Sequence, residues 1–493
     1  MPSHPRRLAV ATAILGTAGV IALTGPVRPT TAAPVVQPAG PSIAPARVVG
    51  SPSCAAASCH GGDGPKGAAG SEYGTVTAAD PHRRAFAVLF QERSERMVRS
   101  LAGGAAHAPA HRTAACLACH GAAPPNPAEP LEPTDEAHRS ASCENCHGAA
   151  ERYLSVHYTA GWKALSAADK AGFGLVPTKR LADRAKICAG CHVGGPGREV
   201  DHRLIAAGHP ALRFELAAYQ AEPLYPRHWR ETTLGPDAEA WEWLIGQAAT
   251  ARAAADLLRH RAAEASERKR DWPELAEYAC FACHQGLAPA AGGGVRSDRT
   301  NAPKAGQLPW GSWAYPLTLR LAGQPTAGWL SPSERPTGLV ALAALFRETD
   351  RPPPARTRDA ATAAVADLDR WLTDLQSAAD RRSASHPLTP AELRAALRHV
   401  ARFADDVPTT DAPSTDWDRY VQGFLGAAAL YRALVRVDSS ARAPGLEADL
   451  RTLAAELRFR RGQDGPQWTA DDRARHKAAW AALAARLDSG ERP

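Results

Sequence analysis

Cysteine and histidine are the residues of this chain whose spacing could support chemistry. The ten cysteines form five pairs, and a histidine directly follows the second cysteine of every pair. Four pairs have the spacing Cys-x-x-Cys-His, whereas the first, CAAASCH, has four residues between its cysteines. The five sets are Cys54, Cys59 and His60; Cys116, Cys119 and His120; Cys143, Cys146 and His147; Cys188, Cys191 and His192; and Cys280, Cys283 and His284. With 18 histidines in 493 residues, five such coincidences have a chance probability of roughly 10⁻⁷.

Cys-x-x-Cys-His is the signature of covalent haem c attachment. The two thiols add to the vinyl groups of the porphyrin, and the adjacent histidine ligates the iron as its proximal ligand. Zinc ribbons need paired cysteines without a histidine after each pair, and thioredoxin-like sites need a single pair. The pattern therefore predicts five covalently attached haem c groups. For CAAASCH, a disulfide between Cys54 and Cys59 is the alternative.

Each haem iron has a second axial position, which a further residue can fill or leave open for a substrate. Methionine ligation is nearly excluded because the chain contains only Met1 and Met97. We therefore expect the distal ligands to be histidines outside the motifs. The main candidates are His82, His157, His202, His209 and His228.

Local sequence favours some of these histidines. Asp80 and Pro81 predict a helix start that would place His82 on an apolar face. Pro210 likewise predicts a helix start beside His209. The weaker candidates His107, His111 and His138 lie in stretches rich in alanine and proline, and His386, His399 and His476 are interpreted as ordinary surface or core histidines.

The N-terminus has the features of an export signal. A basic start, an apolar run of 18 residues and small residues at a possible cleavage site predict a signal peptide over residues 1–33. An uncleaved membrane anchor is the alternative. Residues 34–50 are rich in proline, alanine and valine and predict a flexible lead-in. Because haem c is attached outside the cytoplasmic membrane, we expect a periplasmic or otherwise exported protein with no membrane insertion after cleavage.

The rest of the chain divides into two parts with different composition. Residues 51–300 hold all five motifs and are rich in turns, which predicts an irregular pentahaem cytochrome c domain. A linker rich in glycine and proline follows over 286–309. Residues 310–490 lack cysteine and show helical apolar periodicity, with capping signals at Thr389 and Thr469. They predict a bundle-like helical domain without cofactor, and the fold class is expected to be all-α.

The net charge does not indicate a nucleic-acid partner. The formal charge is +7, and removal of the signal region with its three arginines leaves +4. Each ferric haem with two ionised propionates adds about −1, so the loaded protein is close to neutral. We expect redox proteins as the electron donor and acceptor.

Several segments resemble one group of exported multihaem cytochromes c. They are SCENCHGAAERYLSVH, DHRLIAAGHPALRFELAAY, WPELAEYACFACHQG and LPWGSWAYPL. The group is related to the superfamily of tetrahaem cytochromes and hydroxylamine oxidoreductases. The resemblance covers roughly residues 54–320 and implies haems packed in parallel and perpendicular pairs, with electron transfer between their edges. It also implies that the five main distal candidates match ligand positions.

The superfamily that this chain resembles includes enzymes, but the catalytic signatures of those enzymes are missing from this sequence. Pentahaem nitrite reductases have a Cys-x-x-Cys-Lys motif, whereas all five motifs of this chain end in histidine. The crosslinking tyrosine of hydroxylamine oxidoreductases has no identifiable counterpart. The sequence therefore predicts an electron-transfer protein. The alternative is a multihaem oxidoreductase that acts on a small nitrogen or sulfur compound at a five-coordinate haem, with catalytic residues that the sequence does not identify.

Overall fold

The computed structural model describes most of the chain from residue 46 onward. The described residues are 46–121, 132, 143–221, 225–230, 234–279, 310–311, 313–323, 329–349, 351–382, 386–404, 413–457 and 470–489. The predicted signal peptide, most of the lead-in, the linker and the fifth motif with Cys280, Cys283 and His284 lie outside them.

Within the described residues the protein is helical, with isolated bridges as the only β-structure, which confirms the predicted all-α class. The part that contains the motifs has mostly short helices: α1 (Glu72–Ala79), α2 (Glu92–Ala102), α3 (Ala114–His120), α4 (Cys143–His147), α5 (Ala160–Ala164), α6 (Ala167–Gly172), α7 (Leu181–His192), α8 (His202–Ala206) and α9 (Leu216–Gln220). From α10, which still precedes the fifth motif, onward the helices are mostly longer: α10 (Ala238–Ser266), α12 (Pro316–Gly323), α13 (Thr337–Glu348), α14 (Pro354–Arg381), α15 (Pro390–Ala401), α16 (Pro413–Val437), α17 (Pro444–Glu456) and α18 (Ala470–Ser489).

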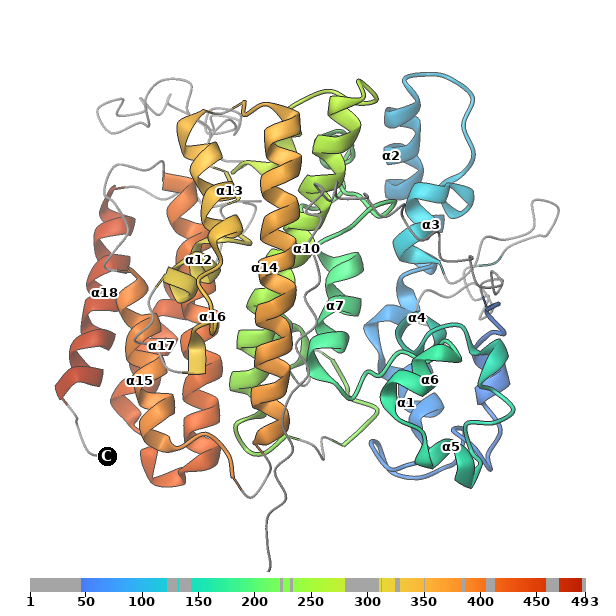
Figure 1. Ribbon diagram of the computed structural model, residues 1–493, viewed down its shortest axis with the longest axis horizontal. Coiled ribbons are helices and arrows are strands. Elements are labelled where there is room, and N and C mark those ends of the chain that lie inside the picture. The colour runs from blue at the N-terminus through green and yellow to red at the C-terminus, as the bar shows by residue number, and fades with distance from the viewer. Residues whose placement is uncertain are drawn as a thin grey trace, which may run out of the picture. The chain divides into compact units, whose positions relative to one another are not determined.

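The long helices α10 and α14 lie side by side, and α7 packs against both of them (Figure 1). α10 is rich in alanine and is buried on most of its circumference, as expected for a helix at the centre of a bundle. Small residues allow its neighbours to approach. A Cβ atom on Gly246 would lie 2.6 Å from Cβ of Leu216, so a larger residue there would force α9 away from α10.

One hydrophobic core extends across the expected boundary between residues 51–300 and 310–490. It includes Leu181 of α7, Trp243 of α10, Leu368 of α14 and Leu430 of α16. The division into two domains stays a prediction, but the described helices of both parts share this core.

Polar contacts also connect the two parts. The backbone N–H of Ala182 on α7 donates to Oε1 of Gln376 on α14 at 2.8 Å. Lys186 of α7 pairs with Asp369 of α14 at 2.9 Å. The α7 helix, which ends in the fourth haem motif, is therefore positioned by a helix of the later part.

Some predicted helix starts are confirmed and others are wrong. Thr389 caps α15 in a capping box with Glu392, whereas Thr469 lies outside the described residues. Pro210 does not begin a helix, because the chain stays non-helical until α9 begins at Leu216. The carboxylate of Asp80 accepts the backbone N–H of His82 as a helix cap does, but the element that follows is only a short 3₁₀ turn, η2 (Pro81–Arg84).

Candidate haem-binding centres

Three of the cysteine motifs lie at helix ends. α3 ends at His120, α4 runs from Cys143 to His147, and α7 ends at His192. Because helical residues three and four positions apart share a face, the two thiols and the imidazole of each motif lie on one side of their helix. The first motif is different. Cys54 ends the 3₁₀ turn η1 (Ser51–Cys54) and an irregular turn follows, which accommodates the two additional residues.

Each described motif histidine lies next to a histidine from another part of the chain. The ring pairs, with the distance between ring centroids, are His60 and His157 (6.2 Å), His120 and His209 (6.4 Å), His147 and His228 (6.4 Å), and His192 and His82 (5.9 Å). All four partners are among the distal candidates predicted from the sequence. The structure thus brings together residues that lie far apart along the chain.

The spacing of these rings suits an iron atom between them. An imidazole nitrogen binds a metal at about 2 Å, and the ring centroid lies about 1 Å further out, so two axial imidazoles separate their centroids by about 6 Å. By comparison, His111 stacks directly on Phe90 with centroids only 4.3 Å apart. The four pairs therefore have the donor type and the spacing that bis-histidine haem ligation requires.

Hydrogen bonds hold the outer nitrogen of many of these rings. In each case the histidine Nδ1 lies within hydrogen-bonding distance of an oxygen atom. The pairs are His82 with Asp80 Oδ1 (2.8 Å), His60 with Glu72 Oε2 (3.0 Å), His120 with Ala85 O (2.8 Å), His157 with Leu154 O (2.9 Å), His209 with Pro210 O (2.8 Å) and His147 with Thr178 Oγ1 (3.4 Å). A carbonyl or carboxylate partner fixes the proton on Nδ1 and leaves the lone pair of Nε2 for a metal.

Burial keeps several of the imidazoles neutral, which is the form that binds metal. It lowers the pKa of His147 and of His192 to about 4 and also lowers the pKa of His209. His82 is different, because the hydrogen bond with Asp80 raises its pKa in spite of burial.

The thiols of different motifs lie close to one another. A hydrogen bond from Cys54 lowers the pKa of Cys143 to about 7, and one from Cys119 lowers the pKa of Cys191 to about 6. Burial and then the nearby thiol of Cys188 raise the pKa of Cys146 to about 12. The first motif is thus adjacent to the third, the third to the fourth, and the fourth to the second. None of the eight described cysteines forms a disulfide, and these include Cys54 and Cys59.

A cavity of about 140 Å³ lies beside the position where the chain enters the fifth motif. Tyr278 and Ala279, which directly precede Cys280, line it together with Val200 and Ile205 from the segment around His202. Its other walls come from α10, from the segment after the linker and from α16; they include Thr250, Leu257, Arg261, Trp313, Tyr315 and Asp418. The cavity therefore lies where both the haem-bearing part and the later helices contribute residues.

Three buried polar atoms of the cavity wall have no hydrogen-bond partner among the described residues. They are Thr250 Oγ1, Arg261 Nη2 and Tyr315 Oη. Burial raises the pKa of Tyr315 well above its usual value, so its phenol remains a hydrogen-bond donor. Buried donors normally have partners. These donors suit a group with acceptor oxygens, such as the propionate carboxylates of a haem.

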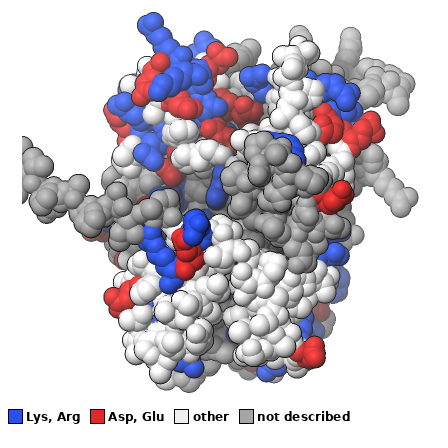
Figure 2. All heavy atoms as spheres, turned by 90° about the vertical axis from the view of Figure 1, so that its right-hand side faces the viewer, with Lys and Arg blue, Asp and Glu red and all other residues white. Residues whose placement is uncertain are grey.

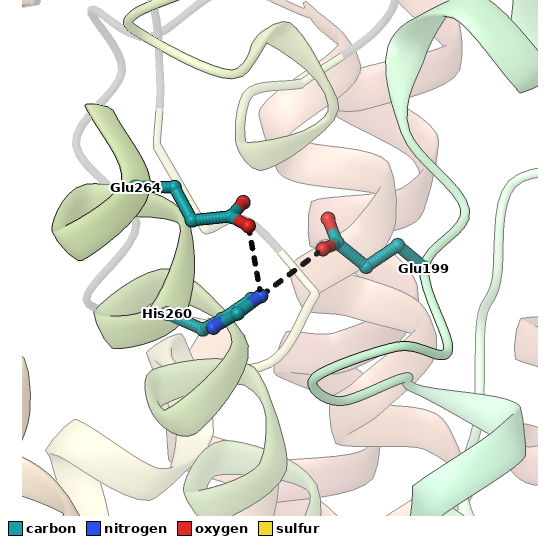
Figure 3. A group of neighbouring side chains, drawn as sticks. All are labelled: Glu199, His260 and Glu264. Carbon is teal, nitrogen blue, oxygen red and sulfur yellow. Dashed lines mark ion pairs between the residues drawn. The ribbon is translucent and has the colours of Figure 1, made fainter. Parts of the chain in front are cut away.

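An ion-pair cluster of Glu199, His260 and Glu264 lies next to Arg261 of the cavity wall (Figure 3). Nε2 of His260 on α10 is 3.5 Å from Oε1 of Glu264 and 3.8 Å from Oε1 of Glu199. The three groups have the spacing of a metal site. However, Arg261 and Arg270 contact Glu199 at 2.9 and 3.1 Å, so guanidinium groups already supply positive charge here. We interpret the cluster as a structural connection between the loop before α8 and the end of α10.

The remaining predicted histidines do not pair with a motif histidine in the described structure. His107 is exposed, and its Nδ1 lies 3.2 Å from the carbonyl oxygen of Ala105. His476 is buried and accepts a hydrogen bond from Trp480. His138 lies outside the described residues. His202 donates its backbone N–H to Oε1 of Glu274 at 2.9 Å, which places α8 close to the approach to the fifth motif.

Sequence reasoning missed two kinds of residue in these centres. It identified Asp80 only as a helix cap and did not identify Glu72, although both accept from the Nδ1 of a paired histidine. It also missed the cavity donors Arg261 and Tyr315. A carboxylate two residues before a candidate ligand was a usable signal for Asp80, but no local signal marks the others.

Residues 54–148 match the family model of cytochrome c554 and c-prime. The matched segment contains the first three motifs, including CAAASCH, and it supports a multihaem type of cytochrome c with covalently bound haem and a role in electron transfer. The expected wider relation to hydroxylamine oxidoreductases is not confirmed. No curated protein and no solved structure matches this chain.

The surface around the motifs is uneven in charge. Figure 2 shows charged side chains of both signs gathered in the upper part of this face and few in the lower part. In Figure 1 the corresponding lower region contains α1, α5 and α6. Tyr158 and Phe173, chain neighbours of α5 and α6, are 68% and 37% exposed. Among the described residues, every helix is too short or too polar to cross a lipid bilayer.

Proposed function

We propose that the protein is an exported electron-transfer cytochrome that carries five haem c groups, each with two axial histidines. The observation that carries this proposal is the spacing of about 6 Å in all four described histidine pairs. When bound, haem c supplies an iron that changes reversibly between its ferric and ferrous states. Two axial histidines leave no position for a substrate, which favours electron transfer over catalysis.

The haems are numbered here by the order of their motifs. The proposed axial pairs are His60 and His157 for haem 1, His120 and His209 for haem 2, His147 and His228 for haem 3, His192 and His82 for haem 4, and His284 and His202 for haem 5. Because His60 pairs with His157 at the same spacing as the other three pairs, we propose that CAAASCH binds haem in spite of its longer spacer.

The assignment of haem 5 rests on position. Four of the five main candidates pair with other motifs, which leaves His202. Its segment and the residues before Cys280 line the same cavity. Two donor atoms there without a partner among the described residues, Arg261 Nη2 and Tyr315 Oη, suit the haem propionates.

The proposed route of electrons follows from the contacts between thiols. Haem 1 is adjacent to haem 3, haem 3 to haem 4, and haem 4 to haem 2. Haem 1 is one end of this route, and Tyr158, next to its proposed axial ligand His157, is 68% exposed. We propose that a redox protein docks near haem 1, on the surface with few charges. Export is part of the proposal because haem c is attached outside the cytoplasmic membrane.

A second candidate function is favoured by the cavity beside the fifth motif. If His202 did not reach the iron of haem 5, its open axial position and the donors of Arg261 and Tyr315 would form a site for a small nitrogen or sulfur compound. The protein would then be a multihaem oxidoreductase.

Two measurements on the purified, oxidised protein distinguish these functions. Mass spectrometry of the denatured chain should show five haem masses above the mature polypeptide, and Cys54→Ala combined with Cys59→Ala should remove one of them. Electron paramagnetic resonance should show only low-spin haem. A haem count of four in the unmodified protein would contradict the assignment of CAAASCH, and a high-spin ferric signal would favour the oxidoreductase.

A further inference from the structure

Two of the paired histidines have a carboxylate on Nδ1. Asp80 Oδ1 lies 2.8 Å from Nδ1 of His82, and Glu72 Oε2 lies 3.0 Å from Nδ1 of His60. Backbone groups hold both carboxylates in place, because Asp80 also accepts the N–H of His82 at 2.9 Å and Glu72 accepts that of Gly70 at 3.1 Å. The carboxylates are therefore fixed parts of the structure.

The two carboxylates differ in burial. The side chain of Asp80 is 5% exposed, whereas that of Glu72 is 26% exposed. Water screens a charge less when the charge is buried. Asp80 should therefore act more strongly on its histidine than Glu72 does.

The other described pairs have only neutral Nδ1 partners. Both histidines of the proposed haem 2 contact backbone carbonyls, those of Ala85 and Pro210. In the proposed haem 3, Thr178 lies 3.4 Å from Nδ1 of His147, and Nδ1 of His228 has no partner among the described residues.

A carboxylate on Nδ1 strengthens an imidazole as an electron donor to iron. Charge-assisted hydrogen bonds are roughly twice as strong as neutral ones, and such outer partners raise the basicity of the ligating nitrogen. A more basic ligand and a nearby negative charge both stabilise ferric iron over ferrous iron. The reduction potential of that haem consequently falls.

On the basis of the axial pairs in the proposed function, we propose that Asp80 and Glu72 are potential-tuning residues that give haems 4 and 1 lower potentials than haems 2 and 3. Haem 4 lies between haems 3 and 2 in the proposed route. Among the four haems whose axial pairs are described, electrons therefore reside on haems 2 and 3 first. Asp80 determines how unfavourable it is for an electron to cross haem 4 between them.

The test is a redox titration of the loaded, full-length Asp80→Asn variant, followed by absorbance and by the low-spin resonance signals. Asparagine is itself a good capping residue, so the substitution removes the charge and keeps a hydrogen-bond acceptor at the start of η2. We expect the reduction potential of one haem to rise. At a fixed applied potential its ratio of ferric to ferrous iron should fall about tenfold, which corresponds to about 59 mV for one electron.

Glu72→Gln should raise the potential of a different haem by a smaller amount, and it provides an independent test if Asp80→Asn loses haem. Glu92→Gln is the matched control, because it removes an exposed carboxylate of α2 that pairs with Arg96. No individual haem should shift in that variant.

The outcomes separate the two proposals. If both variants keep five low-spin haems and every potential is unchanged, the tuning role is wrong while the axial pairs stand. If all the haems shift together as much in Glu92→Gln as in Asp80→Asn, the effect is one of net charge and the tuning role is again wrong. If His82→Ala leaves every haem low-spin, the axial pair of haem 4 is wrong and the proposed function itself must be revised.

Discussion

Replacing Glu215 by glutamine is expected to stabilise the protein at neutral and alkaline pH. Glu215 is 2% exposed and caps α9, where its two carboxylate oxygens accept the N–H groups of Ala217 and Ala218 at 3.1 and 2.7 Å. Burial nevertheless raises its pKa to about 7, and the neighbouring carboxylate of Glu242 adds to this effect. Ionisation of Glu215 therefore costs folding free energy.

The size and the pH range of this cost follow from the two pKa values. The ordinary value is 4.5 and the value in the folded protein is about 7. Between pH 4.5 and about pH 7 the native state binds more protons than the unfolded state, so the free energy of unfolding falls as the pH rises. At about 1.4 kcal/mol per pH unit, the loss from this group reaches about 3 kcal/mol at pH 7 and stays constant above it.

Glutamine resembles the protonated form of Glu215, so the variant should lack this loss. The assay is denaturant unfolding of the loaded protein and of the variant from pH 4.5 to pH 8, followed by circular dichroism. The difference in unfolding free energy should grow in favour of the variant by about 3 kcal/mol over that range. Glu92→Gln, at an exposed site, should show no comparable growth. A constant difference between Glu215→Gln and the unmodified protein would refute the raised pKa.

Two further predictions concern ligation and the shared core. His209→Ala should convert one low-spin haem to high-spin and allow it to bind carbon monoxide, whereas the control His111→Ala should leave every haem low-spin; an unchanged resonance spectrum of His209→Ala would remove His209 from the ligands. Leu368→Ala should lower the unfolding free energy by about 2–5 kcal/mol, because Leu368 is fully buried on α14. During denaturant unfolding, the circular dichroism signal of the helices and the haem absorbance should be lost in one transition if α7 shares that core in solution. Two separate transitions would indicate independent domains.

The local part of the proposed haem centres could be predicted from the sequence. Two thiols and an imidazole form one motif within five residues in four cases and within seven residues in CAAASCH, so the spacing alone predicts their chemistry. The helical class and the capping box at Thr389 are likewise local properties. The distal candidates could be proposed because methionine is almost absent from the chain.

The pairing of these histidines could not be predicted from the sequence. His60 and His157 lie in segments with no common pattern, and only the folded chain brings their rings together. The role of Glu72 depends on the same kind of contact, because it lies 12 positions from His60 in the sequence. The prediction for Pro210 failed because proline fixes its own backbone but does not supply the apolar contacts that extend a helix.

The proposed axial pairs, together with the proposed export, also constrain the order in which the chain can fold. Each pair, once joined through iron, closes a loop, and the four loops 60–157, 82–192, 120–209 and 147–228 overlap one another. The earliest of their ends is residue 157, so in a chain exported from its N-terminus no loop can close until that histidine has crossed the membrane. They can then close in the order in which they began. An iron that bound the wrong histidine would form a closed loop of another length, much as a mispaired disulfide does. Early covalent attachment of each haem to its own motif therefore limits the search to one axial position per iron.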